Sequence, residues 1–324
     1  MQIQDVLSRY EADLKNVEEH MRRHFHSDVP LIPEISNHLI SSGGKRFRPL
    51  LLLISSDLCG YRGERRYYLS AVLEFIHTAS LLHDDVIDHA STRRGRASAN
   101  SVWGNSASVL VGDFLYSKSF KMMTDDGDPS IINLLSTITN TMAEGEVFQL
   151  IKCGDMDITE KEYFSLIEKK TAILISAACA LGAILSKASD KKISALMKFG
   201  MRLGTAFQLT DDTLDYSGTE QEFGKAIGTD LREGKITLPL INTLVKCSPA
   251  ERTLIKKIVK KKDSGEKDIQ RIVAIINKHN GIEYALDRAK ACIQEGKKFL
   301  DLFADSEPKR ALFTISDFIL GRKL

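Results

Sequence analysis

The chain has 324 residues, of which 43% are hydrophobic and 27% are charged. That balance is typical of a soluble globular protein and excludes a disordered or fibrous one. Lysine and arginine number 45 against 43 acidic residues, so the formal net charge is only +2. This near-neutral charge lacks the basic footprint of a nucleic-acid-binding domain, and we expect no nucleic-acid partner. With only 21 glycines and 7 prolines to form turns, the composition favours long helices over a β-sandwich or barrel.

Apolar residues recur at steps of three and four along most of the chain, which is the period of an amphipathic α-helix. In chain order, this pattern predicts helices over residues 3–25, 72–86, 131–151, 160–186, 190–216, 236–246, 266–280 and 283–304. Glycines, prolines and charge clusters interrupt it at 43–44, 93–96, 125–129 and 218–234. Because no segment alternates with period two and no low-complexity linker divides the chain, we predict an all-α fold, a single-domain helical bundle over residues 1–324.

The cysteines and the most apolar stretch both bear on the compartment. Five cysteines are scattered with no C-x-x-C pair, a set typical of reduced thiols: Cys59, Cys153, Cys179, Cys247 and Cys292. The first residues lack the basic start and apolar run of a signal peptide. Residues 171–186 are the most apolar stretch, but they are shorter than the ~20 residues that a spanning helix needs. We therefore expect a buried core helix there, no transmembrane segment, and a cytoplasmic protein.

Three carboxylates stand at the end of the helix predicted around residues 72–86, in the sequence Leu81-Leu-His-Asp-Asp-Val-Ile-Asp. Residues four apart share a helix face, so Asp84 and Asp88 project together, with Asp85 one step round. Magnesium explains such a cluster, because it binds one or two carboxylates and completes its shell with water and phosphate oxygens. A solvated acidic face is the alternative that one cluster alone leaves open.

A second copy of this pattern lies near the end of the helix predicted over residues 190–216, at Asp211, Asp212 and Asp215. Two copies make coincidence a poor explanation. Two carboxylate clusters that face one another in a helical bundle can clamp a diphosphate through several metal ions. The residues around the two clusters do not repeat, so we infer no internal duplication.

Basic residues stand before, between and after the acidic clusters: Lys45, Arg48, Arg93, Arg94, Lys170, Lys225 and Lys235. The glycine pair before Lys45 is not a Walker P-loop, because no serine or threonine follows the lysine. Each of these cations alone is adequately explained as a solvated surface residue. Their placement beside carboxylate clusters favours a diphosphate site, in which cations bind phosphate oxygens next to metal ions.

These motifs, in this order, resemble those of the trans-polyprenyl diphosphate synthases, and most closely the bacterial octaprenyl and other long-chain members. The residues that carry the resemblance are Gly43-Gly-Lys-Arg-Phe-Arg-Pro, His83-Asp-Asp-Val-Ile-Asp, Arg93-Arg-Gly, Gly112-Asp-Phe-Leu, Lys170-Thr, Phe207-Gln-Leu-Thr-Asp-Asp-Thr-Leu-Asp, Gly224-Lys and Lys235-Ile-Thr-Leu-Pro. They cover the middle of the chain, and both ends lack a matching motif. The resemblance implies an isoprenoid-synthase bundle with a central active-site cavity.

The resemblance also implies a role for each matched residue. The ligands of about three magnesium ions would be Asp84, Asp85, Asp88, Asp211 and Asp215, with Asp212 and Asp230 assisting. The allylic diphosphate would be held by Arg93, Lys170, Lys225 and Lys235, with Thr171 and Gln208 near the reacting carbon. Isopentenyl diphosphate, the second substrate, would be held by Lys45, Arg48, His77 and Arg94. His77 shares the helix face of Asp84, although a buried, hydrogen-bonded histidine is the plain alternative.

The implied reaction joins an allylic diphosphate, with farnesyl diphosphate as the expected starter, to successive molecules of isopentenyl diphosphate. The diphosphate can leave only if its developing charge is neutralised, which metal ions and fixed cations accomplish. The isopentenyl double bond then attacks the allylic cation, and a proton is lost, with the departed diphosphate as its implied acceptor. No side-chain nucleophile is needed.

Small residues precede the first cluster. At about 100° per residue, Ser80 lies about 40° from the face of Asp84, and Ala79 lies about 140° away. Related synthases with short products place bulky aromatic residues here, so Ala79 and Ser80 imply an open tunnel and a long product. The expectation is a C35–C50 chain, specifically octaprenyl (C40), for a quinone side chain. Close helix packing is the other explanation of the small residues. Candidates for the tunnel floor are Phe114, Met122, Met123 and Phe148.

Three alternatives remain beside the long-chain synthase. A short-chain (C15–C20) synthase is the nearest. A class I terpene cyclase would mix serine, threonine and glutamate into its second metal motif, and it would not need Lys45 and Arg48. A non-catalytic partner subunit should have lost aspartates or basic residues that this chain keeps. The resemblance further suggests a homodimer.

Overall fold

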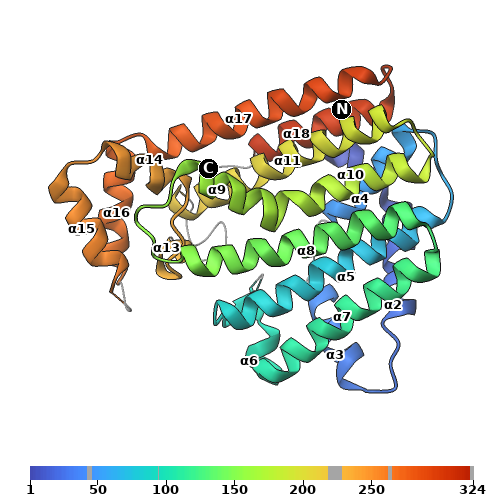
Figure 1. The fold of residues 1–324 in the computed structure, drawn as a ribbon, viewed down its shortest axis with the longest axis horizontal. Helices are drawn as coiled ribbons and strands as arrows, with labels where there is room; N and C mark the ends of the chain where they lie inside the picture. Colours follow the sequence, from blue (N-terminus) through green and yellow to red (C-terminus); the bar gives the residue numbers. More distant parts are fainter. Residues whose placement is uncertain (42–45, 94, 218–227, 262–264, 322–324) are drawn as a thin grey trace. The chain divides into compact units, whose positions relative to one another are not determined.

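The structure, a computed structural model, describes residues 1–41, 46–93, 95–217, 228–261 and 265–321 (Figure 1). Three of the predicted substrate-binding cations, Lys45, Arg94 and Lys225, lie outside these described residues. Regular structure within the described residues is helical, except for a hairpin of two short strands, β1 (Thr92–Arg93) and β2 (Arg96–Ala97). The predicted all-α fold is confirmed.

The helices of the described residues follow one another with short connections. They are α1 (Ile3–Arg9), α2 (Glu11–His24), α3 (Leu31–Ser41), α4 (Phe47–Leu58), α5 (Arg65–Ile87), α6 (Ala99–Trp103), α7 (Asn105–Asp126), α8 (Pro129–Lys152), α9 (Glu160–Ile167), the π-helical turn η1 (Glu168–Ala172), α10 (Ile173–Leu185), α11 (Asp190–Ser217), α13 (Thr229–Arg232), α14 (Leu238–Lys246), α15 (Pro249–Val259), α16 (Glu266–Lys278), α17 (Gly281–Phe299), the 3-10 turn η2 (Leu300–Leu302) and α18 (Glu307–Leu320).

Most predicted helices are present, and three differences have physical reasons. Residues 3–25 form two helices rather than one, because Tyr10 leaves helical geometry while its buried hydroxyl donates to Asp57 at 3.1 Å. The predicted helix over residues 160–186 contains the π-helical turn η1. Helix α7 was not predicted, because its buried face includes Ser108, Gly112 and Ser119, which weaken the apolar periodicity.

The helices form two compact units. The first comprises Met1–Thr139, Leu174–Met197 and Leu300–Thr314, and the second comprises Asn140–Ile173, Lys198–Phe299 and Ile315–Leu324. The first aspartate cluster belongs to the first unit, and the second cluster belongs to the second unit. The single domain over residues 1–324 stays a prediction.

Helix α5 is the central element of the first unit. It packs against α2, α4, α6 and α7, and Figure 1 shows α5 and α7 side by side. All side chains from Leu69 to Ile76 are buried, so this part of the helix has neighbours on every face. Burial of each large apolar side chain contributes about 1.5–3 kcal/mol. This packing fixes the helix whose last turns carry Asp84, Asp85 and Asp88.

Helix α10 contains most of the apolar stretch that the sequence predicts to be buried. Eleven of its residues, from Leu174 to Leu185, are buried, and Ser176 donates a hydrogen bond to the backbone oxygen of Met197 at 2.6 Å. No helix in the described part of the chain has both the length and the apolar character needed to cross a membrane. The buried core helix is therefore confirmed.

In the second unit, α14 packs against α9, α16 and α17. Helix α9 begins with a capping box, in which the Thr159 hydroxyl accepts from the Glu162 backbone N–H at 3.2 Å and Glu162 accepts from the Thr159 N–H at 2.8 Å. Such a cap contributes about 1 kcal/mol and fixes where the helix starts. The cap thereby sets the position of Tyr163, the side chain that reaches the second aspartate cluster.

Candidate active site

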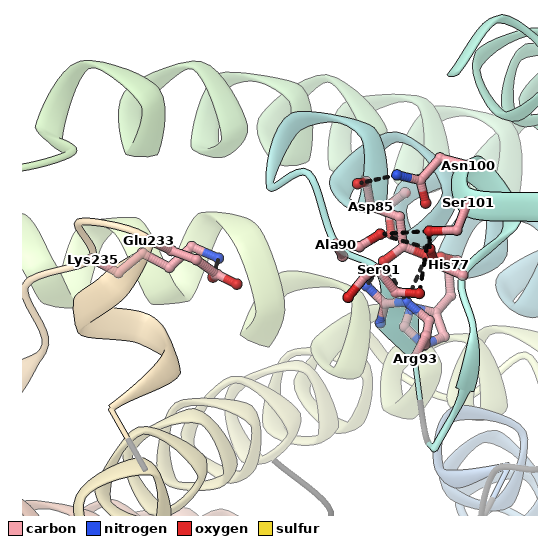
Figure 2. A network of polar contacts seen from close by, with 11 residues as sticks. His77, Asp85, Ala90, Ser91, Arg93, Asn100, Ser101, Glu233 and Lys235 are labelled. Carbon is pink, nitrogen blue, oxygen red and sulfur yellow. Dashed lines mark hydrogen bonds and ion pairs between the residues drawn. The ribbon is translucent and has the colours of Figure 1, made fainter. Parts of the chain in front are cut away.

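The first aspartate cluster divides into one buried and two accessible carboxylates. Asp85 is 0% exposed, whereas Asp84 and Asp88 are half-buried at the end of α5. Arg93 binds the buried carboxylate: its Nε lies 2.8 and 2.9 Å from the two oxygens of Asp85, and a terminal nitrogen lies 2.6 Å from one of them. Asn100 donates to the Asp85 backbone oxygen at 3.1 Å (Figure 2). Asp85 is thus an anchor, and the outer pair remains accessible to solvent.

The loop between α5 and α6 folds back so that Arg93 contacts Asp85 of α5. Strand β1, which carries Arg93, pairs with β2, and the Ser98 hydroxyl donates to the backbone oxygen of Ala90 at 2.6 Å. Figure 2 shows Ala90 and Arg93 in one group of side chains with His77, which comes from α5 two turns before the cluster and is half-buried. His77 therefore lies on the same helix as the cluster, and its role in substrate binding stays a prediction.

Two further motifs of the first unit prove to be partly structural. A Cβ atom at Gly112 would lie 2.3 Å from His83 Nε2, so glycine lets α7 approach α5 next to the cluster. Arg48 is half-buried in the first turn of α4. Its neighbour Arg46 forms ion pairs with Glu18 and Glu74, both at 3.3 Å, and so ties α4 to α2 and α5.

The second cluster repeats this division with different partners. Asp212 is 5% exposed, Asp211 is exposed, and Asp215 is half-buried. The Tyr163 hydroxyl donates to one oxygen of Asp212 at 2.5 Å, and the Gln208 amide nitrogen donates to the other at 2.7 Å. The buried aspartate of this cluster is therefore held by neutral donors. Asp215 accepts backbone N–H bonds at 3.1 and 3.2 Å from the start of α13.

A pocket in the second unit gathers several predicted site residues. Its lining includes Lys170, Thr171, Gln208 and Lys235, together with Asp212, Asp230 and Tyr163. The Thr171 hydroxyl donates to the Gln208 side-chain oxygen at 2.9 Å. Each lysine also has a carboxylate partner that the sequence analysis did not single out. Lys170 Nζ lies 2.6 Å from Glu146, and Lys235 Nζ lies 2.7 Å from Glu233 (Figure 2).

The π-helical turn η1 presents Lys170 and Thr171 to this pocket. Two glycines bring neighbouring helices against it: a Cβ at Gly145 of α8 would lie 2.9 Å from the Lys170 backbone nitrogen, and one at Gly204 of α11 would lie 2.6 Å from the Ala172 Cα. Larger side chains at either glycine would push the helices apart. Single π-helical turns inside α-helices occur frequently at functional sites.

Burial governs the electrostatics of the second cluster. It raises the pKa of Asp212 well above its ordinary value, and the nearby negative charge of Asp230 raises that pKa further. Burial, followed by the charge of Asp212, also raises the pKa of Tyr163 far above its ordinary value. The phenol therefore keeps its proton and acts as a donor to Asp212.

The donor chemistry of both clusters fits magnesium. Each cluster lies in the last two turns of its helix, where the helix dipole adds negative potential and attracts cations. The oxygens of Asp84, Asp88, Asp211 and Asp215 are hard donors of the kind that magnesium prefers. Among the described residues, no three His, Cys, Asp or Glu side chains form a ready-made metal cage. A magnesium ion that also binds phosphate oxygens of a substrate needs only one or two carboxylates from the protein.

Comparison with known proteins decides the family. A family model described as "Polyprenyl synthetase" matches residues 29–276. The chain belongs to the polyprenyl synthetase family. The octaprenyl diphosphate synthase of Haemophilus influenzae is 38% identical to it over 322 residues, which are 99% of this chain and 98% of that protein. The resemblance found in the motifs is confirmed.

Solved structures of polyprenyl synthetases share the whole fold. A decaprenyl diphosphate synthase from Rhodobacter capsulatus has a TM-score of 0.94 and 39% identity, with 99% of each chain covered. A polyprenyl synthase from Caulobacter crescentus, solved in complex with calcium and isoprenyl diphosphate, has a TM-score of 0.95 and 36% identity, with 100% of this chain and 98% of that chain covered. The predicted isoprenoid-synthase fold is thereby confirmed.

Several residues that contact the predicted site residues were not themselves predicted from the sequence. Glu146, Tyr163 and Glu233 match no motif, and the partners of the first two are distant in the chain. Glu146 pairs with Lys170, which lies 24 residues later, and Tyr163 bonds to Asp212, which lies 49 residues later. A glycine directly before Glu146 in an otherwise long helix is the one cue that the sequence offers.

Proposed function

We propose that this protein is a magnesium-dependent trans-prenyltransferase that joins an allylic diphosphate to successive isopentenyl diphosphates and releases a long-chain polyprenyl diphosphate. Its full-length relatives include octaprenyl and decaprenyl diphosphate synthases, at 38% and 39% identity, which supports both the reaction and a long product. The predicted C40 octaprenyl chain is the specific form of this proposal, and farnesyl diphosphate is the proposed starter.

The pocket of the second unit is the observation that carries the proposal. Its lining includes the ammonium groups of Lys170 and Lys235, the Thr171 hydroxyl and the Gln208 amide, together with Asp212 and Asp230. Cations bind phosphate oxygens, whereas the uncharged oxygens of Thr171 and Gln208 are suited to a carbocation that must not be quenched. A pocket that offers both fits a substrate whose diphosphate leaves an allylic carbon.

Each group has a defined task in this reaction. When bound at the outer aspartates, magnesium would neutralise the charge that develops on the leaving diphosphate. Lys170 and Lys235 would bind the allylic diphosphate as they exchange Glu146 and Glu233 for phosphate oxygens. Arg93 would use the N–H groups that do not face Asp85 for the same diphosphate. Lys225 is proposed to assist it, and Lys45, Arg48, His77 and Arg94 are proposed to hold isopentenyl diphosphate.

The reaction is tested by incubating the protein with Mg²⁺, isopentenyl diphosphate and a C10, C15 or C20 allylic starter. Chromatography of the dephosphorylated products should show a long-chain polyprenol, with the C15 starter used best. Products that stop at C15–C20 would favour the short-chain synthase, and a cyclic hydrocarbon would favour the terpene cyclase. No elongation with any starter would overturn the proposal.

Chain length is proposed to depend on the small residues before Asp84. Ala79 is fully buried, and Ser80 is half-buried with its hydroxyl donating to the His77 backbone oxygen at 2.8 Å. A Phe side chain at Ala79 would overpack the core and cost about 1–3 kcal/mol, so Ser80 is the better site to test. Ser80→Phe should shorten the main product, whereas Ser194→Phe, at a half-buried serine of α11, should not. Unchanged length in Ser80→Phe would contradict the tunnel.

The homodimer, the cytoplasmic location and the use of the product for a quinone side chain stay predictions of the resemblance. Gel filtration with light scattering would test the first of them directly. A mass of twice 36.2 kDa is expected for the dimer.

A further inference from the structure

A chain of three hydrogen bonds joins three helical segments at the pocket of the second unit. Tyr163, from α9, donates to Asp212 at 2.5 Å. Gln208, one turn before Asp212 on α11, donates to the same carboxylate at 2.7 Å. Thr171, from η1, donates to the Gln208 oxygen at 2.9 Å. The chain therefore ends at the two uncharged side chains that are proposed to lie near the reacting carbon.

The orientation of the Gln208 amide depends on Asp212. The terminal torsion of a glutamine is broad, so packing alone does not fix which way its oxygen points. A carboxylate accepts hydrogen bonds and thus turns the NH₂ group of Gln208 toward itself. The amide oxygen then faces Thr171, whose hydroxyl donates its hydrogen bond to that oxygen. Two oxygen dipoles are thereby fixed side by side.

The orientation of Asp212 in turn depends on Tyr163. The terminal torsion of an aspartate is as broad as that of a glutamine, and Gln208 holds only one of its oxygens. Tyr163 holds the other from a rigid ring that is 2% exposed. Helix α9 is itself fixed at its start by the capping box of Thr159 and Glu162. This cap does not depend on Tyr284 of α17, whose hydroxyl donates to Glu160 at 2.7 Å. Tyr163 is thus a rigid donor on an anchored helix.

We propose that Tyr163 is a positioning residue that acts through Asp212 to hold the Gln208 amide and the Thr171 hydroxyl in the orientation that stabilises the allylic cation. The inference rests on the proposed prenyl-transfer function. Dipoles that are already oriented need no reorganisation when the positive charge develops, so their loss affects the transition state more than the ground state. Tyr163 lines the same pocket but carries none of the predicted substrate-binding charges.

The test compares Tyr163→Phe with Tyr284→Phe in the purified full chain. Each variant loses one phenol that donates to a carboxylate, and each lost bond involves α9, but only the first bond reaches Asp212. Tyr163→Phe should lower kcat about 10- to 100-fold, the scale of a misplaced reacting group. The KM for the allylic diphosphate should change less than about threefold, because binding charges are untouched. Tyr284→Phe should keep the wild-type kcat.

A double-mutant cycle with Gln208→Ala shows whether Tyr163 acts through Gln208. In the Gln208→Ala background, Tyr163→Phe should cause little further loss of kcat, because the group that it positions is absent. An additive loss, or a changed dependence of activity on Mg²⁺ concentration, would show another route and overturn the inference. So would a wild-type kcat in Tyr163→Phe. All of these comparisons are made against an active wild-type enzyme. If the proposed function is wrong, the wild type itself shows no elongation, and that result is distinct from any effect of Tyr163→Phe.

Discussion

The two aspartate clusters share a sequence pattern but stabilise their buried carboxylate in opposite ways. In the first unit, the cation Arg93 compensates the charge of Asp85. In the second unit, the recorded partners of Asp212 are the neutral donors Tyr163 and Gln208, and Asp230 adds negative charge nearby. In both clusters the first and third aspartates keep some exposure. The comparison teaches that a three-aspartate motif contains two kinds of carboxylate, an outer pair suited to metal and an inner anchor.

Removal of an outer carboxylate should have the largest effect. Asp84→Asn and Asp211→Asn should each lower kcat/KM by about 10³-fold or more, since metal ions contribute several kcal/mol to the transition state at about 1.4 kcal/mol per tenfold. Steady-state assays at saturating Mg²⁺ measure this, and a chelator should abolish wild-type activity. Because both residues keep exposure, thermal unfolding should change little. If either variant kept near-wild-type activity, the division into outer ligands and inner anchors would be wrong.

Replacing the residue that binds the buried aspartate should lower the unfolding free energy by different amounts in the two clusters. Arg93→Met leaves the buried charge of Asp85 without its cation and should cost on the order of 3 kcal/mol of unfolding free energy. Tyr163→Phe removes one of two neutral donors to Asp212 and should cost only about 1 kcal/mol. Thermal or urea unfolding of both variants checks the order. Equal losses would mean that the nature of the partner does not matter.

The second cluster should also give a pH-dependent stability. Because the folded state raises the pKa of Asp212, folded protein binds that proton more tightly than unfolded protein does. Stabilisation from this group is fully present below its ordinary pKa and is lost as the pH rises through the raised folded value. In chelator, the wild type should therefore lose stability relative to Asp212→Asn as the pH rises above the ordinary aspartate pKa of about 4. A flat difference in unfolding midpoint above that pH would contradict this assignment.

The smallest expected effect concerns the competition between Glu146 and substrate for Lys170. Both side chains are about one-quarter exposed or less, and such an ion pair contributes only about 0–1 kcal/mol. Glu146→Gln should therefore lower the KM for the allylic diphosphate by less than about fivefold, with kcat almost unchanged. Glu144→Gln is a matched control, because Glu144 pairs with the adjacent Lys169 outside the pocket lining. A higher KM in Glu146→Gln would mean that Glu146 positions Lys170 instead of competing for it.

The sequence alone supports much of this description. Apolar spacing predicts the helices that carry both clusters, and α8 and α11 agree with their predicted bounds to within two residues. Motif order identifies the family, and helical spacing places His77 with Asp84. Helix α7 was missed because small polar residues and glycine occupy its buried face.

Other features depend on residues that are distant in the chain. The spacing of Asp84, Asp85 and Asp88 predicts a shared acidic face, but it does not show that Asp85 is the buried member. That distinction arises because Arg93 folds back over Asp85 and because Tyr163 reaches Asp212 from α9. The π-helical turn η1 is equally invisible in the periodicity, since it is held by close contacts at Gly145 and Gly204.

By itself, therefore, the sequence determined the helical fold, the family and the two acidic motifs, because helical period and motif order are local properties of the chain. Only the tertiary structure decided which aspartate of each motif is buried and what holds it there. Burial and hydrogen-bond partners depend on packing between elements, and a carboxylate that leaves water must find its donors wherever the fold supplies them.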